Sequence, residues 1–200
     1  PGPRAPAPER TPAAATGVMA DAARPAPALV VCWGSELRGD DAAGLHFARR
    51  LEAVAPPDTG VVEVAQLTPE LAIDVAAAAR VVFVDAAAPG LVEGVSDEPV
   101  IRRIARADAA AGRLIPSCVH SLSPPRLLEL AALLYGCEVE AWQLYLPAES
   151  FELGAGLSAT AASGVDAGLA LILAFLAPAR GAAAPPPPSQ QPEPPTPQPL

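Results

Sequence analysis

Short apolar runs alternate with longer stretches in which apolar residues recur at helical spacing. The apolar runs predict buried strands, namely Ala28–Trp33, Val61–Ala65, Val81–Val84, Leu114–Ser117 and Glu140–Leu146. The helical spacing predicts helices, namely Asp40–Val54, Pro69–Ala79, Arg102–Ala111, Ser123–Tyr135 and Ala161–Leu176. Thr68 and Ser123 precede prolines and are typical N-cap residues.

Strands that alternate with helices of this length indicate an α/β fold. We expect a three-layer α/β/α sandwich around a mostly parallel, roughly five-stranded sheet. In such sheets, ligands bind beyond the carboxyl ends of the strands. That edge is therefore where functional residues are expected.

Proline marks the limits of this pattern. Of the 26 prolines, 7 lie in residues 1–27 and 9 in residues 185–200. This composition predicts disordered tails at 1–27 and 179–200 around one domain at 28–178. A scaffold that acts through its proline-rich tails is one functional alternative.

The charge disfavours several classes of partner. The formal net charge is -9, and residues 28–176 contain 9 Arg against 19 Asp and Glu, a net of -10. An acidic domain is a poor partner for nucleic acid or an anionic membrane, whereas basic protein segments or metal ions suit it. The chain contains no lysine, which excludes Walker loops and Schiff-base chemistry.

The cysteines and the hydropathy favour a cytoplasmic protein. The three cysteines form no CxxC pair, and an odd number argues against a disulfide framework. No uninterrupted apolar run reaches the roughly 18 residues of a membrane helix. We therefore expect a reducing compartment and no membrane partner.

Three polar clusters follow predicted strands. The first strand leads through a Gly34–Asp41 segment, the third ends at Asp85, and the Leu114–Ser117 run leads to His120. In a parallel sheet these loops share one edge, so the three side chains can converge. Two carboxylates and an imidazole suit nickel or zinc, and three protein ligands leave coordination positions open. The pattern predicts a metal site at Asp41, Asp85 and His120.

Each candidate also has a structural interpretation. Asp40 lies at a helix start, where a carboxylate stabilises the helix dipole, and this is the better interpretation for that residue. Asp85 could cap the following turn, and His120 could be a hydrogen-bonded loop histidine. His46 is interpreted as a surface or packing residue of the first helix. Cys118 near His120 suggests a thiol protease, but no third orienting group is evident, so a small buried residue is the simpler interpretation.

A nucleotide-binding α/β protein is a further alternative. Gly34 and Gly39 follow a strand and precede a helix, but the G-x-G-x-x-G spacing is absent because Cys32 and Ser35 occupy positions that need glycine. Ser35 also lacks the flanking glycines of a hydrolase nucleophile elbow.

The order of these segments resembles the NiFe-hydrogenase maturation endopeptidases. The matching segments cover residues 28–176 in the family's order, namely Cys32–Gly44 (CWGSELRGDDAAG), Val82–Ala86 (VFVDA), His120–Leu128 (HSLSPPRLL), the Gln66–Leu71 segment (QLTPEL), and the Pro147–Glu152 and Gly156–Ser158 segments. Cys32 and Ser35 depart from the family's glycine and asparagine, and the Gly-Gly-Thr loop of other branches is absent.

The resemblance implies an aspartyl or metal-assisted endopeptidase that removes the C-terminal extension of a hydrogenase large-subunit precursor after nickel insertion. It assigns Asp41, Asp85 and His120 as metal ligands and catalytic residues, with nickel supplied by the substrate and zinc or cadmium able to substitute. It implies substrate binding by Gly34, Ser35 and Asp40. The alternative is a non-proteolytic metal-binding or chaperone-like maturation factor on the same fold.

Overall fold

The protein folds around a five-stranded sheet. A computed structural model describes residues 28–92, 96–106 and 122–177. The strands are β1 (Ala28–Trp33), β2 (Thr59–Val64), β3 (Arg80–Ala87), β4 (Val100–Ile104) and β5 (Glu140–Pro147). Their order is β2-β1-β3-β5-β4, and all neighbours are parallel except the antiparallel pair β4–β5.

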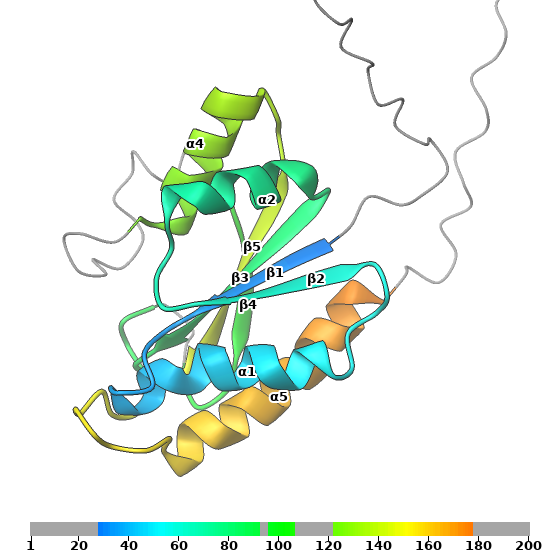
Figure 1. The fold of residues 1–200 in the computed structure, drawn as a ribbon. Helices are drawn as coiled ribbons and strands as arrows, with labels where there is room; N and C mark the ends of the chain where they lie inside the picture. The colour runs from blue at the N-terminus through cyan, green and yellow to red at the C-terminus, as the bar shows by residue number, and fades with distance from the viewer. Residues whose placement is uncertain (1–27, 93–95, 107–121, 178–200) are drawn as a thin grey trace, which may run out of the picture.

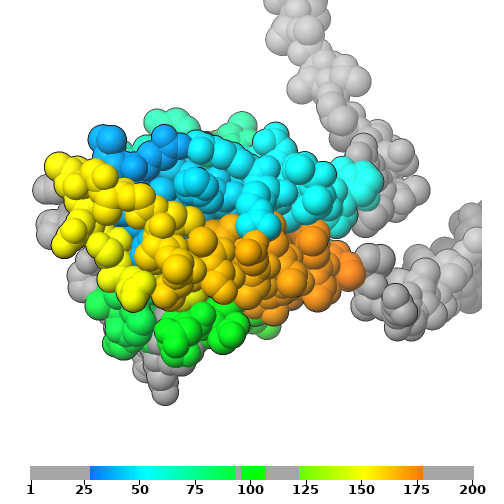
Figure 2. Space-filling view, turned by 90° about the horizontal axis from the view of Figure 1, so that it is seen from below, coloured from blue at the N-terminus to red at the C-terminus, as the bar shows by residue number. Residues whose placement is uncertain are grey.

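The helices cover both faces of the sheet, as the sequence pattern predicts (Figure 1). The helical segments are η1 (Gly39–Ala42), α1 (Ala43–Glu52), η2 (Pro69–Leu71), α2 (Ala72–Ala77), α4 (Pro124–Tyr135) and α5 (Ala159–Leu176), where η marks a 3₁₀ helix. Helices α1 and α5 pack on one face, and α2 and α4 pack on the other. Figure 2 shows α1 and α5 side by side. The three-layer α/β/α expectation is confirmed.

The period-two pattern of the strands divides most of the core into two large clusters, one on each face of the sheet. In β1, Val30 and Cys32 face α1 and α5, whereas Leu29 and Val31 face α2 and α4. Phe47 and Phe83 are fully buried, one in each cluster. Burial of each such large side chain stabilises the fold by about 1.5–3 kcal/mol. Both faces of the sheet are therefore fixed by apolar packing.

Two predicted elements differ from the structure. The helix expected at Arg102–Ala111 is wrong where it is described, because Val100–Ile104 forms β4 and pairs with β5, and residues 107–111 lie outside the described residues. The expected third strand is longer than predicted, since β3 continues past Asp85 to Ala87. The strand expected at Leu114–Ser117 lies outside the described residues.

The predicted N-cap positions are confirmed, but the side-chain hydrogen bonds expected of N-caps are not formed there. Thr68 and Ser123 occupy the N-cap positions of η2 and α4, and neither side chain forms a capping hydrogen bond. By contrast, the Ser158 hydroxyl caps α5 by accepting from the Ala161 N–H at 3.1 Å. The sequence pattern did not predict Ser158 as a cap.

Among the residues that the structure describes, helix α5 is long and apolar enough, by length and composition alone, to cross a membrane. Its Val165, Leu169 and Ile172 nevertheless pack into the sheet core. Its Asp166 forms an ion pair with Arg50 of α1. These contacts are those of a core helix of an α/β domain.

Candidate functional site

The parallel strands β1, β3 and β5 bring their carboxyl ends to one edge of the sheet (Figure 1). Three connections begin there, namely the turn from Gly34 into η1, the loop after β3, and the loop from Ala148 to Ser158 that leads into α5. This carboxyl edge carries the candidate residues.

Asp85 lies within β3, near the carboxyl end of the strand, rather than after it. Strand alternation places it on the same face as Phe83, the face covered by α2 and α4. The side chain is partly buried, and Oδ1 accepts the Ala86 N–H at 2.9 Å. Burial and the negative charge of Asp41 raise the pKa of Asp85 to about 8, and the Ala86 hydrogen bond offsets only part of that rise. In the absence of a cation, this carboxyl is largely protonated at neutral pH.

Asp41 lies in η1, directly before α1, and is also partly buried. Burial raises the pKa of Asp41, although the Arg38 guanidinium and the Ser35 backbone N–H act in the opposite direction. Asp41 follows the turn at the carboxyl end of β1, and its charge acts on Asp85 near the carboxyl end of the neighbouring strand β3. The negative charge of Asp41 disfavours ionisation of Asp85, and a bound cation would relieve this repulsion. Two such carboxylates are a fitting donor set for a divalent metal.

Asp40, the adjacent acid, has the opposite environment. Its side chain is fully buried and accepts three backbone N–H groups, from Glu149 (2.6 Å), Ser150 (3.0 Å) and Ser158 (2.6 Å). It also accepts the Ser158 hydroxyl at 2.8 Å. Burial alone would raise the pKa of Asp40, but these hydrogen bonds outweigh burial and lower it. The carboxylate therefore ties η1 to the loop before α5. We place Asp40 among the residues that position the site rather than those that contact substrate.

The expected turn residues Gly34 and Ser35 shape the connection between β1 and η1. Gly34 has φ 150°, and a Cβ at this position would overlap the carbonyl oxygen of Asp41. Only glycine permits this close approach. The Ser35 carbonyl accepts the Arg38 N–H at 3.2 Å, and its hydroxyl accepts the Leu37 N–H at 3.3 Å. Both residues fix the position of Asp41, and a substrate contact through either one stays a prediction.

The third predicted ligand, His120, and the nearby Cys118 lie outside the described residues. Within the described ranges, no group of three His, Cys, Asp or Glu side chains is placed to hold a metal. The pair Asp41 and Asp85 is thus the part of the predicted trio that the structure brings together. His46 is exposed on α1, as a surface residue would be.

Tyr145 is a neighbour of the site that sequence reasoning missed. It lies opposite Asp85 in the β3–β5 register and is 5% exposed. Burial and the charge of Asp85 raise the pKa of Tyr145 to about 12, while Arg102 acts to lower it. The alternation of β5 contained the signal, because Gln143 and Tyr145 place polar groups on one buried face of the strand.

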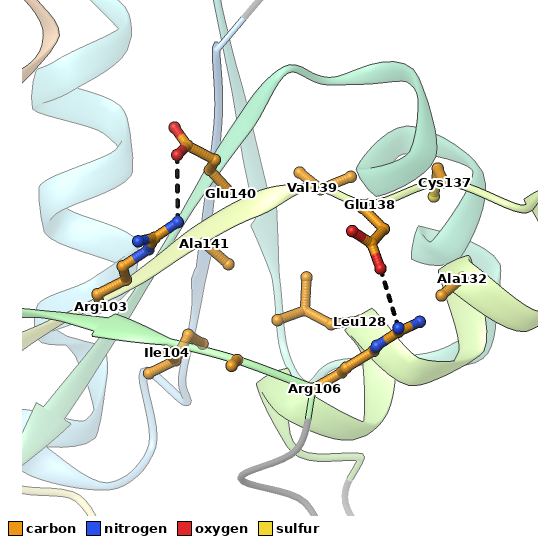
Figure 3. A pocket seen from close by; sticks show the side chains of 11 residues that line it. Arg103, Ile104, Arg106, Leu128, Ala132, Cys137, Glu138, Val139, Glu140 and Ala141 are labelled. Atoms are coloured by element: carbon orange, nitrogen blue, oxygen red, sulfur yellow. Dashed lines mark hydrogen bonds and ion pairs between the residues drawn. The ribbon is translucent and has the colours of Figure 1, made fainter.

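A cavity of about 450 Å³ lies away from these residues, between the end of β4, the start of β5 and α4 (Figure 3). Two ion pairs border it, Arg103–Glu140 at 3.2 Å and Arg106–Glu138 at 2.9 Å. Neither Asp41 nor Asp85 lines this cavity. It is therefore separate from the acidic pair at the carboxyl edge.

The sequence matches no protein-family model and no curated protein. Solved structures of the same fold do exist. The protein superposes on the NiFe hydrogenase maturation protease HybD from Thermococcus kodakarensis with a TM-score of 0.58 and 22% identity, covering 75% of this chain and 99% of that one. The hydrogenase maturating endopeptidase HybD from E. coli gives a TM-score of 0.57 and 23% identity, with 75% and 91% covered.

A third structure, the hydrogenase 2 maturation peptidase from a Thaumarchaeota archaeon, gives a TM-score of 0.55 at 21% identity, with 75% and 97% covered. At these identities the likeness establishes the fold. The protein thus shares the α/β/α architecture of solved hydrogenase maturation peptidases over nearly their full length.

Proposed function

We propose that the protein is an endopeptidase that removes the C-terminal extension of a NiFe-hydrogenase large-subunit precursor after nickel insertion. The observation that carries this proposal is that Asp41 and Asp85 both lie at the carboxyl edge of the sheet, where the charge of Asp41 contributes to the raised pKa of Asp85. The order of sequence segments that resembles the maturation endopeptidases supports it, as does a fold shared with such enzymes.

In this proposal the metal belongs to the substrate. Asp41 and Asp85, with His120 as the third ligand, would bind the nickel that the precursor already carries, so that only loaded precursor is held in place. Zinc or cadmium would substitute in the same ligand set. Because Asp85 has a pKa of about 8, metal binding must displace its proton, and binding is therefore stronger at higher pH.

The proposed chemistry is hydrolysis of one peptide bond. Water adds to the scissile carbonyl, the C–N bond breaks, and the new amine takes a proton. A cation next to the carbonyl oxygen polarises it, or activates the attacking water. The chain's own contribution is to hold the two carboxylates in fixed positions, Asp41 through the Gly34 turn and Asp85 through strand β3.

Processing of purified precursor tests the proposal. Nickel-loaded and nickel-free precursor are each incubated with the protein, and the mass of the precursor's C-terminus is measured. We expect a mass loss for loaded precursor only, and its abolition by Asp85→Ala. Asp74→Ala, which removes an exposed carboxylate of α2, is the matched control and should process normally. An Asp85→Ala enzyme with normal processing would refute the proposal.

The same experiment addresses the non-proteolytic alternative. Cys32 is fully buried in the core and Ser35 shapes the turn beside Asp41, at the two positions that depart from the resemblance. A protein that binds loaded precursor without any mass loss would be a maturation factor rather than a protease. We also propose a cytoplasmic location, which the free Cys32 and Cys137 thiols support.

A further inference from the structure

Two large apolar side chains are exposed on connections at the carboxyl edge of the sheet, one of which carries Asp41. Leu37 lies in the turn after β1 and is 68% exposed, and Leu153 lies in the loop after β5 and is 82% exposed. Leu37 precedes Asp41 by only four residues. Exposed apolar residues that gather next to a functional site are typical of surfaces that bind another protein. We call these two loops with their leucines the double-loop surface.

The two loops are held together, although they are far apart in the sequence. The Gly154 N–H donates to the Leu37 carbonyl at 2.8 Å, and the Asp40 N–H donates to the Ser150 carbonyl at 2.8 Å. The buried Asp40 carboxylate adds its own bonds to the second loop. Figures 1 and 2 both show the two loops side by side at one end of the domain. The leucines therefore project from a braced frame, so binding a partner requires little ordering of the backbone.

The charge around the leucines indicates what kind of partner fits. Glu149 and Glu152 are exposed on the second loop, and among the described residues neither forms an ion pair. The adjoining Asp41 adds a further acidic group, which the nearby Arg38 offsets in part. A second copy of this chain, with a net charge of -9, would be repelled from this surface. A peptide segment with a large apolar residue next to Lys or Arg is complementary to it.

We propose that the double-loop surface docks a segment of the precursor in which a large apolar side chain adjoins a basic one, and so places the neighbouring peptide over Asp41 and Asp85. This inference rests on the proposed function for the identity of the partner. Leu37 and Leu153 contact the apolar side chain, and the two glutamates face the basic one.

Direct binding and processing are measured with purified nickel-loaded precursor. We expect the double variant Leu37→Ser/Leu153→Ser to raise the Kd and the KM at least tenfold, with kcat changed less than twofold. The control is Val54→Ser/Leu133→Ser, which removes two exposed apolar residues, one just after α1 and one in the last turn of α4. It should bind like the unmodified protein. A leucine variant that binds as tightly as this control overturns the docking surface.

Salt dependence tests the acidic half of the surface. Binding of the unmodified protein should weaken at least threefold between low and high ionic strength, because exposed charge pairs are screened. Glu149→Gln/Glu152→Gln should lose most of this dependence, and an unchanged dependence would contradict the assignment of a basic neighbour. Sedimentation tests whether a second copy of this chain occupies the surface. A dimer that the leucine substitutions dissociate would show that a second copy occupies the surface, contrary to the proposal.

The two readouts separate failure of this inference from failure of the proposed function. Precursor that binds without being cleaved refutes the endopeptidase, and the docking surface is then judged by the Kd of the leucine variant alone. Precursor that is cleaved equally well by the leucine and control variants refutes the docking surface alone. A protein that neither binds nor cleaves the precursor refutes both.

Discussion

The neighbouring acids Asp40 and Asp41 show how far local sequence determines the role of a residue. Both precede a helix, and the pattern alone allows either to stabilise its start. Hydrogen bonds outweigh burial and lower the pKa of Asp40, whereas burial raises the pKa of Asp41. The partners of Asp40 lie more than a hundred residues later in the chain. Local sequence could place Asp41 and Asp85 at one edge through the strand pattern, but the brace formed by Asp40 required the three-dimensional structure.

The raised pKa of Asp85 predicts an unusual dependence of stability on pH. The unfolded chain releases this proton near pH 3.8, the ordinary value for aspartate, whereas the folded protein keeps it until about pH 8. The folded state therefore binds more protons across this window, and Asp85 lowers the free energy of unfolding progressively as pH rises through it. Asp85→Asn should stabilise the metal-free protein, on the order of 2 kcal/mol at pH 7 and much less at pH 5.

Urea unfolding of both proteins at several pH values, with chelator present, measures this difference. Asp74→Asn on the surface of α2 serves as the control and should show no such trend. A constant difference between the Asp85→Asn and unmodified proteins from pH 5 to pH 8 would show that Asp85 titrates normally.

Strand β4 shows where periodicity gave the wrong element. The alanines that follow Arg106 extend an apparent helical pattern from Arg102 to Ala111. The structure instead pairs Ile104 with Ala141 and Arg102 with Gln143 in an antiparallel register. Pairing with β5 and burial of Ile104 stabilise the strand, and both depend on a segment about forty residues away. Short segments follow such tertiary contacts rather than their own propensity.

The helix starts offer a matched test of capping. The Ser158 hydroxyl accepts the Ala161 N–H and donates to Asp40, so it joins the cap of α5 to the brace. Ser123 holds the same position in α4 without a side-chain capping bond. Ser158→Ala should destabilise the protein by about 1–3 kcal/mol, since it removes a cap and a bond to a buried carboxylate. Ser123→Ala should change stability by less than about 0.5 kcal/mol.

Denaturant midpoints of the two serine variants give the comparison directly. Equal destabilisation by both substitutions would mean that the hydroxyl of Ser158 adds nothing beyond its position at the start of a helix.

The alternation of strands and helices was sufficient to predict the three layers, but not the order of the strands. Parallel β1, β3 and β5 follow from the βαβ pattern. The position of β4, antiparallel at the edge beside β5, reverses the chain direction in a way that no single segment encodes. The face that each helix covers was likewise set by packing, since α1 and α5 share one cluster although they lie at opposite ends of the domain sequence.

The two core clusters also bear on the proline-rich ends of the chain. Both clusters are built from described residues between Ala28 and Leu176, and so are the Asp40 brace and the double-loop surface. A chain shortened to residues 28–178 should therefore unfold with the same denaturant dependence and a free energy within about 0.5 kcal/mol of the full chain, because the buried surface that sets these quantities is retained. It should also process loaded precursor at the same rate. If the protein is a scaffold acting through its tails, the shortened chain would instead fold normally and lose its effect on maturation. Measuring stability and processing on the same two proteins separates these cases. Removing the tails of a scaffold abolishes function alone, whereas removing a tail that packs on the domain lowers both stability and processing. An independent protease domain keeps both without its tails.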